Sequence, residues 1–423
     1  MPSIENVPYF EYQPIEGVER LERYRPGGYH PIHIGDVLKG RYRVVHKLGH
    51  GAYSTIWLSR DEHQAVYVAV KISTGDSSPH EADILCAIAN SPGVDDPGRS
   101  IIPIIQDRFE IQGPNGCHKC YVTPPAQSSV AAASFSHLFK IETARALVAE
   151  LVLAVAYIHA QGIVHGDIHL GNALIRLPTS FDRLSVEQLY QKFGEPYTEA
   201  VMRLDGQPLP AGTPARGTVP VWLGKKANEV TLAEAHLLLS DFGEAFSPTD
   251  SQQKRRGDQC HAPLSVLPPD AYFEPDKPLS FPTDIWTLAC AIWSIFSSRP
   301  LFDATLATHD DISSQQVDIL GPLPLEWWDS WEVRHEYFEE RGEPKKDRFI
   351  FPSLEHCFEK EIQAPRDKIG MGGFDRDEMV AILTMLRSML AFKPEERATA
   401  KAVLGSDWMV TWGLPEFEKI RQT

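Results

Sequence analysis

The segment IVHGDIHLGNALI, residues 163–175, carries the most informative motif of this 423-residue chain. It places Asp167 and Asn172 five positions apart, between apolar residues that have the composition of buried segments. A carboxylate at the first position can accept the proton of a hydroxyl group, and an amide oxygen at the second can bind Mg²⁺. This D-x-x-x-x-N spacing is typical of phosphotransfer sites. A polar turn between two buried segments would not require the spacing, so it is the weaker interpretation.

Further signals lie on both sides of this stretch. Downstream, LLLSDFGEAF carries Asp241 in a D-F-G triplet, the expected position of a second Mg²⁺ ligand. Upstream, LGHGAYSTIWL forms a Gly-x-Gly-x-x-Ser loop that would let backbone N–H groups approach a phosphate, and VAVKI carries Lys71 on the next strand-like run. A two-glycine hairpin turn and a solvent-facing lysine are the ordinary alternatives. Because the signals follow the order of the protein-kinase template, together they indicate a phosphotransferase.

Two pairs of opposite charges fit the same template. Glu81, on the helix-like segment HEADILCAIAN, is the only nearby Glu that could hold Lys71 in position. An exposed carboxylate near a helix N-terminus is the alternative. Asp270 of LPPDAYF stands where the template has the Glu of A-P-E, and Arg397 of FKPEERATA is its expected partner. We expect these two to be buried together, since either alone would be an uncompensated charge.

Helical periodicity dominates the second part of the chain. Apolar residues recur at intervals of three and four over 141–158 and 379–390, and residues 284–296 are apolar on nearly every side. Asp284 begins the segment 284–296, at a position where kinases have an aspartate that braces the backbone of the catalytic loop. The alternative role is a helix N-cap, which Thr283 could equally supply.

The first part of the chain has the pattern of β-strands. Residues 1–41 lack a clear period and form an extension, and short β-branched and aromatic runs follow over 42–72. A helix is expected over 80–90, and two strands over 101–111 and 118–123, joined by the turn signal GPNG. The fold class is therefore α+β, with a small β-rich lobe before a large, mainly helical lobe.

Composition limits the class of protein. The hydrophobic share is 43% and the charged share 23%, as in ordinary soluble globular proteins. The net charge of −16 argues against direct nucleic-acid binding, and no apolar run approaches the ~20 residues of a membrane span. The start, MPSIENVPYFEY, lacks the form of a secretory signal, and six irregularly spaced cysteines indicate reduced thiols in the cytoplasm or nucleus. Cys117 and Cys120 have no second finger-like pair, so we expect hairpin residues and no zinc site.

The motifs quoted so far resemble those of one kinase family. The opening YHPIHIGDVLKGRYRVVHKLGHGAYSTIWL is similar to that of the SR-protein kinases, Ser/Thr kinases that phosphorylate Arg/Ser-rich splicing factors. Ser54 at the third loop position, a long insert at 177–235 and the linker GPLPLEWWDSWEVRHEYF agree with that family. The insert is rich in Pro and Gly, with one expected helix at 185–193. The resemblance covers roughly residues 29–412 and is greatest to a divergent fungal branch.

The resemblance implies a bilobal protein-kinase fold and a serine/threonine kinase that uses ATP and Mg²⁺. The kinase domain would span 42–412, with an N-lobe at 42–126 and a C-lobe at 127–412. A C-terminal tail would follow at 413–423. The expected partner is a protein substrate that is basic or Arg/Ser-rich, with no membrane and no direct nucleic-acid contact.

Roles for individual residues follow from the matching positions. Asp167 would be the proton acceptor, and the other catalytic residues would be Lys71, Glu81 and His169. The metal ligands would be Asn172 and Asp241. With Thr123 as gatekeeper, the ATP-binding residues would be Leu48, Gly49, His50, Gly51, Ala52, Tyr53, Ser54, Thr55, Ile56, Lys71, Pro124 and Ala126.

The chain also departs from the family pattern. Gly166 stands where an arginine usually precedes the catalytic aspartate, so control through a phosphorylated activation loop is not expected. His169 replaces the usual lysine, as in the HGDxHxxN motif of small-molecule phosphotransferases, although a histidine still donates a hydrogen bond to a phosphate. The activation segment at 247–266 has a sequence of its own, so an Arg/Ser preference does not follow.

Two alternatives to an active protein kinase therefore stay open. Gly166 and His169 are compatible with a pseudokinase or binding scaffold. The motif HGDIHLGN is compatible with an aminoglycoside-type phosphotransferase, against which Asp270, Arg397 and the Asp284 helix count.

Overall fold

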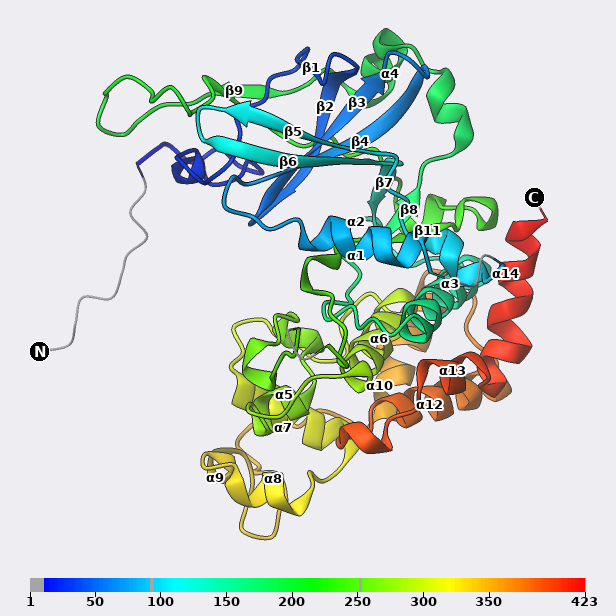
Figure 1. Ribbon diagram of the computed structural model, residues 1–423. Helices are drawn as coiled ribbons and strands as arrows, with labels where there is room; N and C mark the ends of the chain where they lie inside the picture. Colours follow the sequence, from blue (N-terminus) through cyan, green and yellow to red (C-terminus); the bar gives the residue numbers. More distant parts are fainter. Residues whose placement is uncertain (1–10, 92–94, 251–252, 423) are drawn as a thin grey trace, which may run out of the picture. The chain divides into compact units, whose positions relative to one another are not determined.

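The computed structural model describes residues 11–91, 95–250 and 253–422 (Figure 1). The first ten residues of the expected extension, two residues of the activation segment and the last residue of the expected tail lie outside these ranges. The described chain forms two compact units of mixed α and β structure. Unit 1 comprises the described residues up to Cys86 together with Pro103–Gln127 and Leu177–Leu223, and unit 2 comprises the remainder.

An antiparallel six-stranded sheet forms the centre of unit 1, as the alternating β-branched runs predicted. In sheet order, the strands are β1 (Val37–Leu38), β2 (Tyr42–Gly51), β3 (Ser54–Asp61), β4 (Val66–Ser73), β6 (Gly116–Thr123) and β5 (Asp107–Gly113). Helix α1 (His80–Ala89) follows β4 at its predicted position. The strand predicted over 101–111 begins only at Asp107, because Pro103 has no N–H to donate to a ladder. That part of the prediction was wrong.

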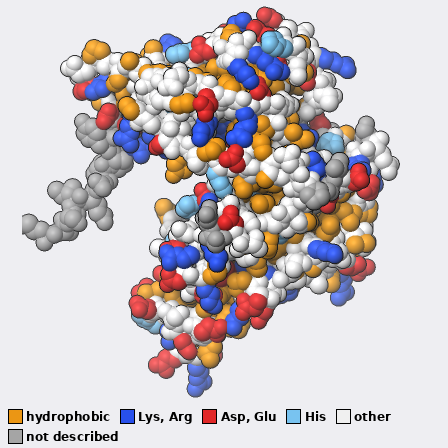
Figure 2. Space-filling model, in the orientation of Figure 1, with side chains coloured by type: hydrophobic (Ala, Val, Ile, Leu, Met, Phe, Trp, Pro, Cys, Tyr) orange, Lys and Arg blue, Asp and Glu red, His pale blue; other side chains and the backbone are white. Residues whose placement is uncertain are grey.

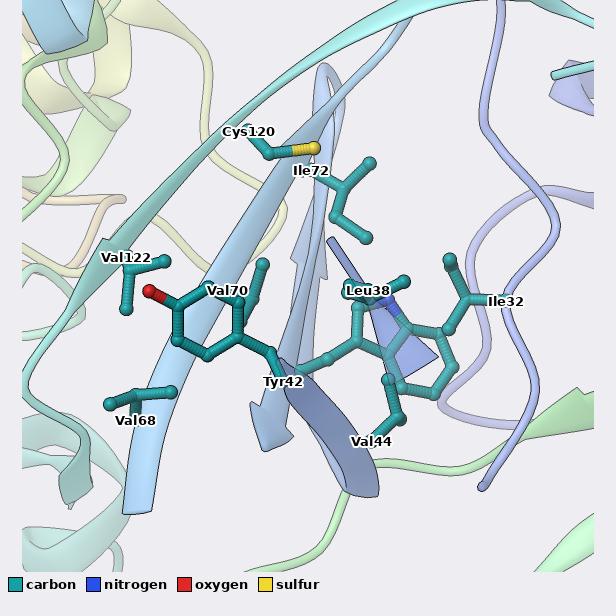
Figure 3. Packing of buried hydrophobic residues seen from close by; sticks show 10 residues of the cluster. Ile32, Leu38, Tyr42, Val44, Val68, Val70, Ile72, Cys120 and Val122 are labelled. Carbon is teal, nitrogen blue, oxygen red and sulfur yellow. The ribbon is translucent and has the colours of Figure 1, made fainter. Parts of the chain in front are cut away.

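One face of this sheet packs around a cluster of aliphatic and aromatic side chains (Figure 3). Every second residue of β4, from Val68 through Val70 to Ile72, is buried in the cluster, as the period of two in a strand requires. Ile32 and Leu38 reach the same cluster from the extension that precedes β2. The described part of the extension therefore contributes to the core of unit 1.

The insert covers the opposite face of the sheet. Val45, Leu58 and Tyr67 each adjoin a residue of the first cluster in sequence, and they pack against Leu189 of helix α4 (Val186–Phe193), the helix predicted in the insert. The sequence alone groups the insert with the larger, helical region. In the structure most of the insert packs within unit 1, because its apolar side chains complete the second layer of that unit.

Long helices form the core of unit 2, at the three places where the sequence predicted them: α3 (Ile141–Ala160), α6 (Phe281–Phe296) and α12 (Arg376–Met389). Two short strands, β8 (Ala173–Arg176) and β11 (Leu237–Leu239), pair antiparallel. The other helices and strands are β7 (Ala126–Ser129), α2 (Val130–Ser134), β9 (Thr198–Ala200), β10 (Arg216–Thr218), α5 (Pro269–Phe273), α7 (His309–Leu320), α8 (Leu325–Ser330), α9 (Arg334–Tyr337), α10 (Leu354–Phe358), α11 (Ala364–Lys368), α13 (Ala400–Leu404) and α14 (Leu414–Arg421). None of the helices in the described ranges combines the length and apolar composition needed to cross a bilayer.

Asp270 and Arg397 pair in the interior of unit 2, as the sequence predicted. The Arg397 side chain is fully buried and lies over the Trp286 ring, 5.0 Å from its centroid. Its guanidinium also donates to the carbonyl oxygens of Pro282 at 3.0 Å and Phe392 at 2.8 Å. A carboxylate and two backbone carbonyl groups from separate segments thus depend on one cation for their arrangement.

We expect Asp270→Ala and Arg397→Ala each to lower the free energy of unfolding by about 3–5 kcal/mol, mostly because each strands its charged partner. The double variant should lose less than the sum of the two single losses. Urea denaturation of the three variants measures this coupling. The exposed pair of Arg387 and Glu355 supplies the control, since Glu355→Ala should cost at most about 1 kcal/mol. Strictly additive losses at 270 and 397 would contradict the pairing.

Candidate active site

Asp284 fixes the backbone of the segment that contains Asp167. Its carboxylate is fully buried and accepts hydrogen bonds from the N–H groups of His165 at 2.7 Å and Gly166 at 2.8 Å, and from Nε2 of His159 at 2.9 Å. Helix α6 begins before Asp284, with Ser280 at the N-cap position. The bracing role is confirmed, and the N-cap alternative is wrong.

Gly166 adopts a backbone conformation that suits only glycine. Its φ is +79°, in the left-handed region, and a Cβ atom there would lie 2.8 Å from the carbonyl oxygen of Glu244. The local fold therefore has no room for an arginine here unless the backbone of Glu244 shifts. Glu244 itself accepts hydrogen bonds from Arg255 and, at 2.9 Å, from Nδ1 of His261.

The Asn172 amide orients Asp167. Its Nδ2 donates to the backbone oxygen of Asp167 at 2.9 Å and to Oδ2 of the carboxylate at 3.0 Å. The other carboxylate oxygen, Oδ1, is buried and has no hydrogen-bond partner among the described residues. Because the side-chain nitrogen of Asn172 donates to Asp167, the side-chain amide oxygen points away from Asp167. The arrangement holds one oxygen of Asp167 and leaves the other able to accept a proton.

His169 faces Asp167 with a defined tautomer. Its Nδ1 accepts the N–H of Gly171 at 3.0 Å, so the proton of a neutral ring resides on Nε2. That Nε2 lies 3.6 Å from Oδ2 of Asp167, and the His169 side chain is 28% exposed. The ring can therefore offer an N–H group beside the carboxylate.

Asp241 is brought to Asn172 by the pairing of β8 with β11. Ala173 pairs with Leu239, and the N–H and Oγ of Ser240 donate to the carbonyl oxygen of Asn172 at 2.8 and 2.9 Å. Asp241 itself has a φ of +63°, a left-handed conformation that Asp adopts more readily than most residues. Carboxylate and amide oxygens are ligands that suit Mg²⁺, so the two side chains fit the ion that the sequence predicted.

Lys71 and Glu81 form an ion pair within unit 1. The Nζ of Lys71 lies 2.6 Å from Oε2 of Glu81, and the side chains are 14% and 15% exposed. Strand β4 supplies the lysine and helix α1 the glutamate, so the predicted pairing is confirmed. In the sheet, Lys71 pairs with Tyr121 and Ala69 pairs with Thr123, which places the Thr123 side chain on the face of Lys71.

The glycine-containing loop, residues 48–56, forms the hairpin between β2 and β3, with Ala52 and Tyr53 at its turn. A Cβ atom at Gly49 or Gly51 would meet no atom within 4 Å. Packing within the protein therefore does not demand these glycines. They keep a space clear beside the backbone, which suits the approach of a phosphate.

The remaining predicted residues are only placed, and their roles stay predictions. Pro124 and Ala126 follow β6, where the chain leaves unit 1, and both are partly exposed. Cys117 and Cys120 lie on β6 and, three residues apart, point to opposite faces, one exposed and one buried. They are hairpin residues, as predicted, and they cannot converge on one metal ion.

Sequence reasoning missed two residues that touch the loop. Tyr29 and Arg23, both in the extension, donate hydrogen bonds to its carbonyl oxygens. Bonds to a backbone carbonyl impose no residue type on the loop, so no motif could have pointed to them.

Comparison with known proteins finds serine/threonine protein kinases that are similar to this chain. No family model matches the chain. A serine/threonine protein kinase of Aspergillus fumigatus is 26% identical over 97% of this chain and 94% of its own length. Serine/threonine-protein kinase SRPK of Physarum polycephalum is 26% identical over 92% of this chain and 91% of its own. SRSF protein kinase 3 of Homo sapiens is 32% identical over 43% of this chain and 34% of its own.

The site and these relatives define a chain of the serine/threonine protein kinase class. Within that class it is SR-protein-kinase-like, as the sequence predicted.

Proposed function

We propose that the chain is an ATP- and Mg²⁺-dependent kinase that phosphorylates serine or threonine in protein substrates. The observation that carries the proposal is the Asp167 carboxylate, whose Oδ2 is held by Asn172 while Oδ1 is buried without a partner among the described residues. A buried carboxylate oxygen without a donor is a strong acceptor for a hydroxyl proton. We interpret unit 1, which includes the extension and most of the insert, as the small lobe of a kinase fold, and unit 2 as the large lobe.

In this mechanism the substrate hydroxyl oxygen forms a bond to the γ-phosphorus of ATP, the bond from that phosphorus to the bridging oxygen breaks, and ADP leaves. The hydroxyl proton passes to the carboxylate of Asp167. His169 donates its Nε2–H to the transferred group as charge develops, and Lys71, steadied by Glu81, contacts the phosphates of ATP. Asn172 and Asp241 would hold Mg²⁺, which neutralises phosphate charge when bound.

The charge of the protein bears on its substrates. The net charge is −16, and on the face shown in Figure 2 acidic and basic side chains are interspersed. The net charge, rather than the arrangement of charges on this face, supports a basic protein substrate, Arg/Ser-rich sequences included. Arg255 and His261 of the activation segment already pair with the carboxylate of Glu244. We therefore infer that these two side chains need no phosphate group as their partner.

Transfer from radiolabelled ATP by the purified full chain tests the proposal. We expect label on an Arg/Ser peptide and on a generic basic protein, only with Mg²⁺ present, and none on aminoglycosides. Nucleotide binding without transfer to any acceptor would indicate a pseudokinase. Label on aminoglycosides alone would indicate a small-molecule phosphotransferase, and either outcome would refute the proposed function.

A further inference from the structure

The turn of the glycine-containing loop is tied to its own unit by three consecutive carbonyl groups. The Tyr29 hydroxyl donates to the oxygens of Gly51 at 2.7 Å and Ala52 at 3.2 Å. The Arg23 guanidinium also donates to Ala52. The oxygen of Tyr53 accepts the N–H of Thr74 at 2.9 Å. All of these residues belong to unit 1.

These bonds determine where the turn presents its N–H groups. In a trans peptide the C=O and N–H point in opposite directions, and the described chain contains no cis peptide. With the oxygens of Gly51 and Ala52 held on one side, the N–H groups of Ala52 and Tyr53 point to the other. Within the described ranges neither N–H donates to a protein acceptor. Successive free N–H groups of this kind form an anion-binding concavity.

Arg23 is itself held between two aromatic rings. Its guanidinium carbon lies 5.3 Å from the centroid of Tyr29 and 5.5 Å from that of Tyr53. The Tyr29 side chain is buried, and burial raises the pKa of its phenol, so the hydroxyl remains a donor. Arg23 and Tyr29 thus reinforce each other while they hold the turn.

Asn115 fixes the backbone beside Tyr29. Its buried Nδ2 donates to the carbonyl oxygens of Tyr29 and Gly212, both at 2.7 Å, and its own carbonyl oxygen accepts the N–H of Gly27 at 2.8 Å. Gly212 belongs to the insert. We call residues 19–29 the strap, because Glu19 joins them to β2 and Tyr29 joins them to the turn, while Asn115 links them to the insert.

The other end of the strap is fixed to β2 by a buried ion pair. Glu19 pairs with Lys47, whose side chain is 1% exposed, and accepts the hydroxyl of Tyr24. Burial lowers the pKa of Lys47 and raises that of Tyr24. Lys47 lies two residues before the loop glycine Gly49. The strap is therefore bonded to the chain just before the loop, at Lys47, and again at the turn of the loop, at Gly51.

We propose that the strap is a positioning device for the phosphate-binding loop, in which Tyr29 and Arg23 hold the turn so that the N–H groups of Ala52 and Tyr53 face the phosphates of ATP. This inference rests on the proposed function. Tyr29 and Arg23 are positioning residues, since they act on the nucleotide only through the loop.

Three variants of the full chain test the strap. Tyr29→Phe removes one hydroxyl and keeps the ring, and Arg23→Ala removes the guanidinium. Arg20→Ala removes an exposed cation of the strap whose ion partner is Glu22 and not a residue of the loop. Hydrogen exchange of residues 49–55, measured without nucleotide, should quicken in the first two variants and not in the third. Calorimetry with Mg²⁺ and a non-hydrolysable ATP analogue should show Kd raised roughly 3- to 10-fold in the same two.

Kinetics then separate positioning from a general loss of structure. KM for ATP should rise by a similar factor, while kcat and KM for the peptide stay within about twofold of the wild type. Unchanged exchange and unchanged Kd in Tyr29→Phe and Arg23→Ala would overturn the strap even if the wild type transfers phosphate. A fall in kcat accompanied by a rise in KM for both ATP and the peptide would also overturn the proposal, because it would indicate a general loss of structure. If the wild type binds no nucleotide, the proposed function fails, while the exchange experiment still decides whether the strap holds the loop.

Discussion

Asp167→Asn lowers kcat for phosphate transfer by about 10²- to 10⁴-fold, with little change in nucleotide affinity. The amide has nearly the shape of the carboxylate, so the hydrogen bond from Asn172 Nδ2 at 3.0 Å can persist to the amide oxygen. What is lost is the acceptor for the hydroxyl proton, because the position of Oδ1 would then be occupied by a donor NH₂ group. Initial rates of peptide phosphorylation and calorimetric binding of an ATP analogue measure the two quantities.

The matched control is Asp407→Asn, which changes an exposed carboxylate on the surface of unit 2. It should leave rate and affinity unchanged. Equal labelling of substrate by the wild type and Asp167→Asn would mean that Asp167 does not take the proton. A scaffold protein would show no transfer in either form.

Asp241→Asn should reduce transfer by about 10³-fold or more, since the charge stabilisation that a metal supplies amounts to several kcal/mol. Asparagine is the informative substitution here because, like aspartate, it tolerates the φ of +63° that an alanine would adopt at a cost. The change therefore removes charge without straining the backbone. A titration of nucleotide binding with Mg²⁺ gives a second readout, and the variant should need a higher Mg²⁺ concentration for half-maximal binding.

Asp407→Asn again serves as the control and should leave the Mg²⁺ titration unchanged. Wild-type transfer rates in Asp241→Asn, or an unshifted Mg²⁺ midpoint, would exclude Asp241 as a metal ligand.

Local patterns in the sequence predicted strands β2 to β6, the three longest helices and part of the site. Lys71 and Glu81 were predictable as a pair because a strand and the following helix bring together residues ten positions apart. The pairing of Asp270 with Arg397, 127 positions apart, was predictable only from the order of motifs and the need to neutralise a buried charge. The strand misplaced at Pro103 shows that an apolar run cannot by itself distinguish a strand from a loop.

The packing of the extension and the insert was not predictable. Tyr29 and Arg23 bind backbone carbonyl oxygens, which every residue type possesses, so no pattern in the loop points to them. Likewise, the sequence predicted the helix that contains Leu189, but the apolar face of that helix does not indicate which of the two units the helix will cover. Long-range burial of this kind depends on the complete fold.

The conformation of Gly166 limits how this kinase can evolve. An arginine at that position is the first requirement for activation by phosphorylation of the activation loop. Any side chain there would have to adopt a φ of +79° and lie 2.8 Å from the carbonyl oxygen of Glu244. A single nucleotide change that creates an arginine would therefore damage the catalytic loop before it could confer regulation. We therefore expect that an arginine at position 166 would require the backbone around Glu244 to move.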